Sequence, residues 1–429
     1  MKCHLTMTPR KKLRFAGWTL LLLLAQLILF KVCYPHGDYG AEAYANGRLW
    51  PAGYAWFLRL FHLFTYSETA LVVFQYLFLE LSALYLYWTI VGLFGLGKPW
   101  SVLLYLFLFV NPLFLYLANV IGGEALFAGV SLLWTAQLCR MLRRPRRYHV
   151  VTMALLVGLA FSLRYDGFCY LLITILAFFY ANYRFRVMVF GILLSILVVM
   201  ALKDRAAYFG AKTTGLRQFP ALDSRQAASD VLYMYPHIRV DSEALPNNWR
   251  LRPLNRVVRQ YVAGNGVNSP DSLLRRYAEE QSNPEKDGYK AWARVKAVFA
   301  AYGTYLVRSH PGAFIRYCFL PDSRGYLFPA LGPLGAHKWL TLFSVLFSVF
   351  NILYLMAVAG FLATGGERRF GRPFTVPIAL ITILLIVHFC FSVYASPVEL
   401  GGQVFVLILE VAFGLVLVHI IGLTKTSEK

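Results

Sequence analysis

Long apolar stretches, separated by shorter polar connections, recur along most of this chain of 429 residues. Many of them hold eighteen or more mostly apolar residues, enough to cross a hydrocarbon core of about 30 Å as a helix. The pattern therefore predicts an all-α polytopic membrane protein with about ten transmembrane helices, in a range of 10–12. The expected spans are 15–33, 69–92, 99–118, 125–142, 148–163, 167–183, 187–202, 339–363, 374–394 and 403–423.

Two features interrupt this pattern near the N-terminus. Asn111 and Pro112 fall inside the third span, where proline predicts a kink or a break into two half-helices. Residues 44–64 are amphipathic and aromatic, which is typical of a helix that lies in the membrane interface. This segment belongs to the first outer loop, 34–68, which is too polar to span a bilayer.

Residues 203–338 form the one segment that is large and polar enough for a separate domain. They hold twenty Lys and Arg against eleven Asp and Glu. We expect a mainly helical insert, with a helix over 289–308 and a return to the membrane over 306–328. The expected domains are an N-terminal transmembrane module (1–202), the insert (203–338) and the C-terminal helices (339–429).

Composition supports the membrane class and explains the charge. The chain is 58% hydrophobic and 15% charged, with a formal net charge of +21. Much of this charge lies in short connections that fall on one side of the ten-span arrangement, so no nucleic-acid partner is expected. By the positive-inside rule that side is the cytoplasm, and it holds both termini and Lys2, Arg10, Lys11, Lys12, Arg14, Arg140, Arg143, Arg144, Arg146, Arg147, Arg184, Arg186, Arg368, Arg369 and Arg372.

The cysteines and the N-terminus add two restrictions. The six cysteines have neither paired nor metal-type spacing, so neither a disulfide framework nor a zinc site is expected. No cofactor is indicated by the sequence, and a divalent-cation requirement stays open. The basic N-terminal residues and the apolar segment Trp18–Val32 resemble a signal peptide without a nearby cleavage site. We expect a retained signal-anchor helix.

Several polar residues converge on the opposite, outer side by topology alone. Asp38 and Glu42 follow the first span, Glu124 begins the fourth, and Arg164 and Asp166 join the fifth and sixth, while Glu399 and Gln403 join the last two. A carboxylate can take the proton of an acceptor hydroxyl as general base. Arginine can bind a phosphate in bidentate fashion and stabilise it as a leaving group.

Five short motifs carry a resemblance to a known family. They are HGDYGAEAYANG after the first span, LWPAGYAWFLRLF behind it, NPLFLYLANVIGGEALF, GLAFSLRYDGF and VRSHPGAFIRY. In this order they resemble the GT-C superfamily of integral membrane glycosyltransferases, in outline closest to protein mannosyltransferases and lipid A aminoarabinose transferases. The resemblance covers most of residues 15–200 and, more weakly, 300–405.

This resemblance implies an inverting transfer of a sugar from a polyprenyl-phosphate carrier to a glycan, lipid or protein acceptor. The chemistry would take place on the periplasmic face of a bacterial inner membrane. The resemblance makes Asp38 the general base and leaves Glu42 as the second acid. Donor phosphate binding falls to Arg164, Arg308 and Arg316, and substrate binding to Glu124, Asp166, Tyr39, Tyr44, Arg59 and His310.

Each of these residues also has a plainer interpretation. Arg164 and Asp166 are two residues apart and can pair with each other as a structural turn. Glu124 begins a helix, where an acidic side chain is favourable through the helix dipole. Arg308 and Arg316 can contact anionic lipid head groups, and His310 is a polar residue in a loop.

Two alternative functions stay open for the whole chain. The first is a transporter or flippase of lipid-linked sugars, against which stands the absence of an inverted repeat in the sequence. The second is a non-catalytic factor in envelope assembly, for which Asp38 would be dispensable. If the chain is a transferase, the basic insert favours an acidic acceptor.

Overall fold

The computed structural model describes all of the chain except residues 1–8, 34–51, 215–230, 241–244, 246–250, 266–272, 275–276, 278–297, 329–339, 396–399 and 428–429. The chain divides into two compact units. The first unit holds Met1–Leu202, Leu331–His388 and Glu399–Lys429, and the second holds Lys203–Ala330 and Phe389–Val398.

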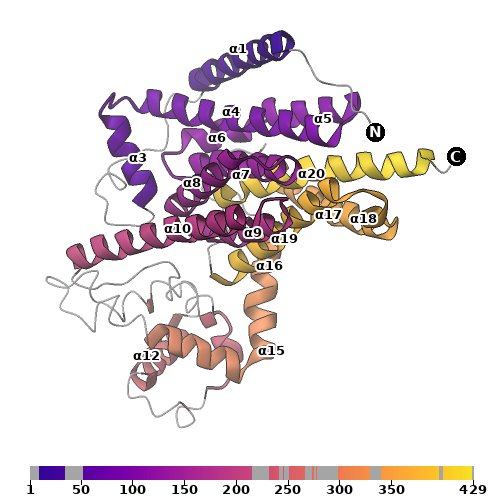
Figure 1. Ribbon diagram of the computed structural model, residues 1–429. Helices are drawn as coiled ribbons and strands as arrows, with labels where there is room; N and C mark the ends of the chain where they lie inside the picture. The colour runs from indigo at the N-terminus through magenta and orange to yellow at the C-terminus, as the bar shows by residue number, and fades with distance from the viewer. Residues whose placement is uncertain are drawn as a thin grey trace. The chain divides into compact units, whose positions relative to one another are not determined.

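All regular structure in the described residues is helical, and no strand occurs among them (Figure 1). The α-helices are α1 (Pro9–Cys33), α3 (Ala52–His62), α4 (Glu68–Phe94), α5 (Lys98–Phe109), α6 (Leu113–Asn119), α7 (Glu124–Arg143), α8 (Arg147–Leu163), α9 (Phe168–Tyr180), α10 (Phe185–Thr214), α12 (Leu251–Asn265), α15 (Pro311–Phe314), α16 (Leu320–Leu327), α17 (Leu340–Ala363), α18 (Gly366–Arg369), α19 (Arg372–Ala395) and α20 (Leu400–Ser427). Short turns η1 (Tyr165–Gly167), η2 (Tyr235–His237) and η3 (Ile315–Phe319) lie between them, and a further helix runs through 298–309.

Eight helical segments in the described part of the chain are long and apolar enough to cross a membrane. They are Leu13–Val32, Glu68–Phe94, Lys98–Asn119, Glu124–Arg143, Phe185–Arg205, Val345–Ala363, Arg372–Val393 and Gln403–Gly422. The prediction of an all-helical polytopic membrane protein is confirmed at this level. The fifth and sixth expected spans form shorter apolar helices, α8 with 17 residues and α9 with 13.

The core of the first unit is built around α7, which packs against α4, α8 and α20. Its sequence alternates large apolar residues with Ala, Gly, Ser and Thr, and small residues let neighbouring helices approach closely. Three polar side chains attach α1 to the following helices, and the first is Thr19, whose Oγ1 shares a hydrogen bond with the Tyr105 hydroxyl at 3.1 Å. Gln26 Nε2 donates to the carbonyl of Phe109 at 2.9 Å, and Lys31 Nζ donates to Asn119 Oδ1 at 2.9 Å.

The expected break at Asn111 and Pro112 is confirmed, because α5 ends at Phe109 and α6 begins at Leu113. Asn111 is buried, and its Oδ1 accepts the backbone N–H of Leu113 at 3.0 Å. The side chain thus satisfies the hydrogen bonding of one of the backbone N–H groups that have no intrahelical partner at the start of α6.

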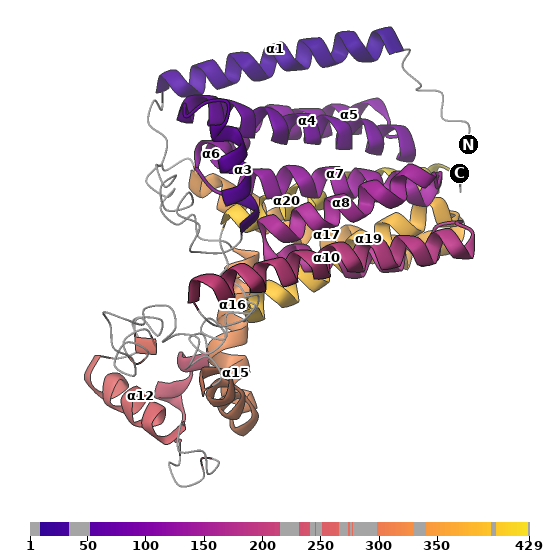
Figure 2. The ribbon, with the colours of Figure 1, turned by 60° about the vertical axis from the view of Figure 1, so that its left-hand side comes forward.

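The two ends of the first unit differ in composition. Figure 1 shows α3 and α6 toward one end and α18 at the other, and α3 and α6 keep this place in Figure 2. The C-terminal end of α7 is basic: Arg140 donates to Thr89 Oγ1 at 3.1 Å and to the Tyr85 hydroxyl at 2.8 Å, and Arg143 donates to the carbonyl of Leu93. These bonds tie the basic end of α7 to α4.

The second unit has its own core, in which α12 packs with the helix through 298–309. The apolar face of α12 buries Leu251, Leu254 and Val258, while Tyr302 and Leu306 come from the later helix. The described parts of the predicted insert are therefore helical. The chain continues through α15, η3 and α16, where Cys318 and Tyr326 are buried.

Candidate functional site

The turn between α8 and α9 holds Arg164 and Asp166 in a fixed local geometry. Arg164 has an extended backbone, and its N–H still bonds to the carbonyl of Ala160 at 2.9 Å. Gly167 closes the turn by donating to the carbonyl of Arg164 at 3.0 Å. A Cβ at Gly167 would lie 2.5 Å from backbone atoms of Ala160, so the turn needs a residue without a side chain.

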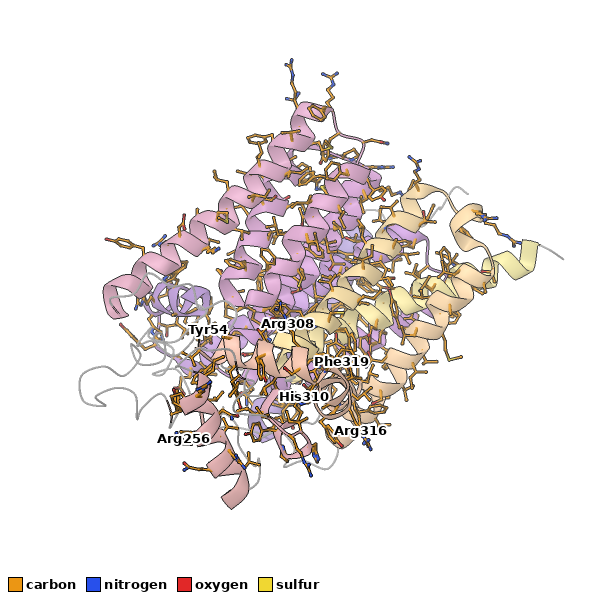
Figure 3. The ribbon with its side chains drawn as sticks, turned by 90° about the horizontal axis from the view of Figure 1, so that it is seen from below. Tyr54, Arg256, Arg308, His310, Arg316 and Phe319 are labelled. Atoms are coloured by element: carbon orange, nitrogen blue, oxygen red, sulfur yellow. The ribbon has the colours of Figure 1, made fainter. Side chains whose placement is uncertain are left out.

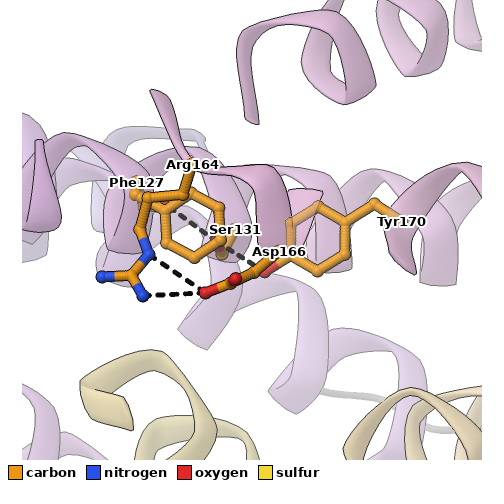
Figure 4. Close-up of polar contacts among 5 residues, drawn as sticks. All are labelled: Phe127, Ser131, Arg164, Asp166 and Tyr170. Carbon is orange, nitrogen blue, oxygen red and sulfur yellow. Dashed lines mark hydrogen bonds and ion pairs between the residues drawn. The ribbon is translucent and has the colours of Figure 1, made fainter. Parts of the chain in front are cut away.

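Arg164 and Asp166 form a charge pair within this turn (Figure 4). Arg164 Nε and Nη2 both donate to Asp166 Oδ2, at 3.0 Å and 2.8 Å. The side chains are 16% and 6% exposed, and the guanidinium lies 5.6 Å above the ring of Phe127. The carboxylate and the ring together fix the plane of the guanidinium, so the plainer structural role of this pair is realised in the structure.

Aromatic rings from α7, α9 and α20 lie around the pair. Tyr170 stacks between Phe127 and Trp134, with centroid distances of 5.9 Å and 4.5 Å. Its hydroxyl donates to Ser131 Oγ at 2.7 Å (Figure 4). Phe405 meets Phe127 edge-on at 5.4 Å. A rigid aromatic wall therefore supports the charged turn.

A histidine from α19 belongs to the same cluster. His388 is 2% exposed and lies edge-on to Phe405, with ring centroids 5.0 Å apart. It also interacts electrostatically with Asp166 and Arg164. Sequence reasoning missed His388, because no local pattern links residue 388 to residue 166.

The start of α3 lies against the end of α8, beside this turn. A Cβ at Gly53 would lie 2.5 Å from Ser162 Oγ, so the two helices touch two residues before Arg164. The neighbouring Tyr54 is buried, and its hydroxyl donates to Gln75 Oε1 at 2.9 Å. The chain that follows the predicted acidic loop is thus anchored at the charged turn.

Several buried polar atoms of the first unit have no hydrogen-bond partner in the described part of the chain, and two of these side chains lie at helix starts. They are Glu124, through Oε2, at the N-terminus of α7 and Gln403, through both polar atoms, near the start of α20. Gln403 is only 3% exposed. Buried polar atoms rarely go without a partner in folded proteins, so these groups are candidates for ligand contacts.

The second unit contains a surface pocket of about 590 Å³, a volume that suits a small-molecule ligand. Two arginines and four other residues line it: Arg316, Leu320, Pro321, Arg324, Gly325 and Phe328. Arg316 and Phe319 are marked in Figure 3. Burial raises the pKa of the nearby Asp322 to about 6. The lining combines two cations with apolar side chains, as an amphiphilic anion requires.

The π-helical turn η3 explains why the two arginines share one pocket. Eight residues of uniform α-helix turn about 800°, which would leave Arg324 about 80° around the helix from Arg316. The i to i+5 hydrogen bonding of η3 accommodates one extra residue, so the turn is about 700° and the offset only about 20°. Sequence reasoning found Arg316 and missed Arg324 because a spacing of eight does not mark one helix face.

The remaining predicted residues have less definite places. Asp38, Tyr39, Glu42 and Tyr44 lie outside the described residues. The other three are Arg59, exposed on α3, Arg308, exposed at the end of the 298–309 helix, and His310, whose Nδ1 is buried without a hydrogen-bond partner in the described residues. Figure 3 marks Arg308 and His310.

No group of three or more His, Cys, Asp or Glu side chains in the described residues could hold a metal ion. Comparison of the chain with protein-family models, with curated proteins and with solved structures finds no match.

Proposed function

We propose that this protein is an inverting glycosyltransferase that takes a sugar from a polyprenyl-phosphate carrier. The observation that carries the proposal is the pocket of Arg316 and Arg324, because its two cations and its apolar lining suit a phosphate on a lipid chain. The order of sequence motifs that resemble GT-C transferases supports the same chemistry. The acceptor would be a glycan, lipid or protein at the periplasmic face of a bacterial inner membrane.

In the proposed reaction Asp38 accepts the proton of an acceptor hydroxyl. The oxygen forms a bond to the anomeric carbon while the bond from that carbon to the phosphate oxygen breaks, and the electron pair leaves on the phosphate. Arginine side chains stabilise the phosphate charge, so no general acid is needed. Displacement from the opposite side inverts the anomeric centre, as in inverting glycosidases.

Two features of the first unit support a sugar-binding role there. Glu124 Oε2 lacks a hydrogen-bond partner in the described residues and can accept a bond from a sugar hydroxyl. Arg164 and Asp166 are held rigidly over Phe127. We assign these residues to substrate binding.

We also propose that the shorter helices α8 and α9 cross the membrane, which brings the eight candidate spans to ten. Both helices pack against α7.

The test uses the full chain in phosphatidylcholine nanodiscs, titrated with undecaprenyl phosphate and with undecaprenol, which lacks the phosphate. We expect Arg316→Gln and Arg324→Gln each to weaken phosphate binding by about tenfold or more, because a charge-assisted hydrogen bond contributes about 1.5–3 kcal/mol. Arg239→Gln is the matched control, since Arg239 is exposed in the same unit and does not line the pocket. Equal affinity of the pocket variants and wild type would remove the main support for the proposal.

A transporter of lipid-linked sugars is the second candidate, and two buried acids favour it. Glu80 in α4 is 1% exposed and Glu410 in α20 is 6% exposed, both within candidate spans. Ionisable side chains inside membrane helices often mark ion pathways. Transport of a polyprenyl-linked sugar across proteoliposomes without any acceptor, lost in Glu410→Gln, would favour this candidate over the transferase.

A further inference from the structure

The helix α12 presents a row of arginines on its exposed side. Arg252, Arg256 and Arg259 follow each other at spacings of four and three residues, so they lie within about 60° of one another around the helix. All three are exposed, and α12 contains no acidic residue. Arg256 is marked in Figure 3. We call Arg252, Arg256 and Arg259 the arginine row.

The core of the second unit fixes which face of α12 is exposed. Leu251, Leu254 and Val258 are 0–2% exposed on the opposite side. The buried Asn255 Oδ1 accepts hydrogen bonds from the hydroxyls of Tyr235 at 3.0 Å and Tyr302 at 2.7 Å. These hydrogen bonds fix the rotation of α12 about its axis, so the packing of the unit keeps the arginine row on the surface.

The arginine row has no carboxylate partner in the described part of the chain. The ion pair found there joins Arg164 and Asp166 of the other unit. Three adjacent cations repel one another, and their charge is stabilised when an anionic partner approaches. Guanidinium groups favour carboxylates and phosphates because they bind them in planar, bidentate geometry.

The packing of α12 argues against a membrane surface as the partner. A helix that lies on a bilayer inserts its apolar face among the acyl chains. The apolar face of α12 is already used, because Leu251, Leu254 and Val258 pack in the core of the unit. What remains exposed is cationic and polar, which suits a soluble chain with repeated negative charges.

We propose that the arginine row binds an acidic glycan, one that carries several carboxylate or phosphate groups along its chain. This inference rests on the proposed transferase function, for which it names the class of acceptor. The row would hold the acceptor by its charges and leave its reacting hydroxyl unbound. Such binding is electrostatic and falls as ionic strength rises.

The test measures binding of fluorescent polygalacturonate and of neutral dextran to the full chain in phosphatidylcholine nanodiscs. The variant Arg252→Gln, Arg256→Gln, Arg259→Gln keeps good helix formers and removes three charges. We expect it to bind polygalacturonate about tenfold more weakly, since three exposed ion pairs are lost and each contributes only modestly. The corresponding triple lysine variant should retain most of the binding, and dextran should bind none of the proteins.

The matched control is Arg144→Gln, Arg146→Gln, Arg147→Gln, which removes three exposed charges from the other unit. Unchanged polygalacturonate binding by the α12 variant, at wild-type thermal stability, would overturn the inference. So would an equal loss in the control, because binding would then follow net charge alone. The inference would also fail if, in phosphatidylglycerol nanodiscs, the wild type bound polygalacturonate no more tightly than the α12 variant. Lipid head groups would then occupy the arginine row.

Undecaprenyl phosphate binding, measured in the same samples, separates this inference from the proposed function. If the α12 variant loses polygalacturonate and keeps undecaprenyl phosphate, both proposals stand. If it keeps both ligands, only the acceptor inference fails. If the wild type binds polygalacturonate through the row but no undecaprenyl phosphate, the row is a glycan site and the transferase proposal fails.

Discussion

Arg164 and Asp166 form an ion pair inside the turn between α8 and α9. Both side chains are mostly buried, and Asp166 Oδ2 accepts two N–H groups of the guanidinium. Removing one partner of a buried pair leaves the other charge without compensation. The energetic contribution of the pair can therefore be measured by itself.

We expect Asp166→Asn to lower the free energy of unfolding by about 3 kcal/mol, because Arg164 would lose its anionic partner in a buried position. Denaturation of the purified chain in a mild detergent measures this change. The double variant Arg164→Gln, Asp166→Asn should lose less than the sum of the two single variants, as coupled residues do. A loss within about 0.5 kcal/mol, the size of an ordinary surface substitution, would show that the pair is not structural.

Asp322 gives a pH dependence whose sign follows from its burial. In the folded chain the pKa of Asp322 is raised from 3.8 to about 6 by burial, so the folded state binds the proton more tightly than the unfolded state. The contribution of the protonated Asp322 carboxyl to the free energy of unfolding is fully present below pH 3.8 and is lost as the pH rises through about 6. Asp322→Asn should therefore reduce the difference in melting temperature between pH 4 and pH 7. The same difference in the variant and the wild type would contradict the raised pKa of Asp322.

At the scale of the helices, sequence reasoning succeeded where the cause is local. Hydropathy located the eight candidate spans, and Pro112 located the break between α5 and α6. The pairing of Arg164 with Asp166 was foreseeable because the residues are two apart. The hydrogen bond between Lys31 and Asn119 joins residues 88 positions apart, and no local sequence pattern predicts such a contact.

The π-helical turn η3 could not be predicted from the sequence. A sequence pattern implies a uniform α-helix, and in a uniform α-helix Arg316 and Arg324 do not share a face. The extra residue within η3 aligns them. The pocket therefore depends on an irregularity of the helix, and such irregularities are frequent at functional sites.

Shifting the register between the arginines should separate them without removing either one. We expect insertion of one alanine after Phe319 to rotate Arg324 by about 100° relative to Arg316. Affinity for undecaprenyl phosphate should then fall as far as it does in Arg324→Gln. The control is deletion of Phe319, which leaves about seven residues of ordinary α-helix, a turn of about 700°, and should keep affinity; equal affinity of the insertion variant and wild type would refute the alignment.

At the scale of the whole molecule, the arrangement of charges predicts an orientation in the membrane. Basic residues lie at the end of α7 and around α18, whereas α3 lies at the opposite end of the first unit from α18 (Figure 1). From the positive-inside rule we propose that the basic end faces the cytoplasm and that residues 203–330 lie on the outer side. Eight candidate spans and the two shorter helices α8 and α9 are compatible with that orientation.

Single-cysteine variants on a cysteine-free background test the orientation. Ser309→Cys in the second unit should react with an impermeant thiol reagent in intact spheroplasts, because the residue is exposed on the proposed outer side. Arg144→Cys and Arg369→Cys should react only in inverted vesicles. Labelling of all three from the same side would contradict the arrangement.

The most direct test of the transferase account is Asp38→Asn in cells, with the amount of protein in the membrane measured in parallel. A lost general base lowers the rate by about 10²–10⁴-fold. The account predicts that one envelope glycan loses a sugar, while the corresponding polyprenyl-phosphate sugar accumulates in mass spectra of the lipid fraction. An unchanged glycan profile at normal protein abundance would contradict both the role of Asp38 and the proposed reaction.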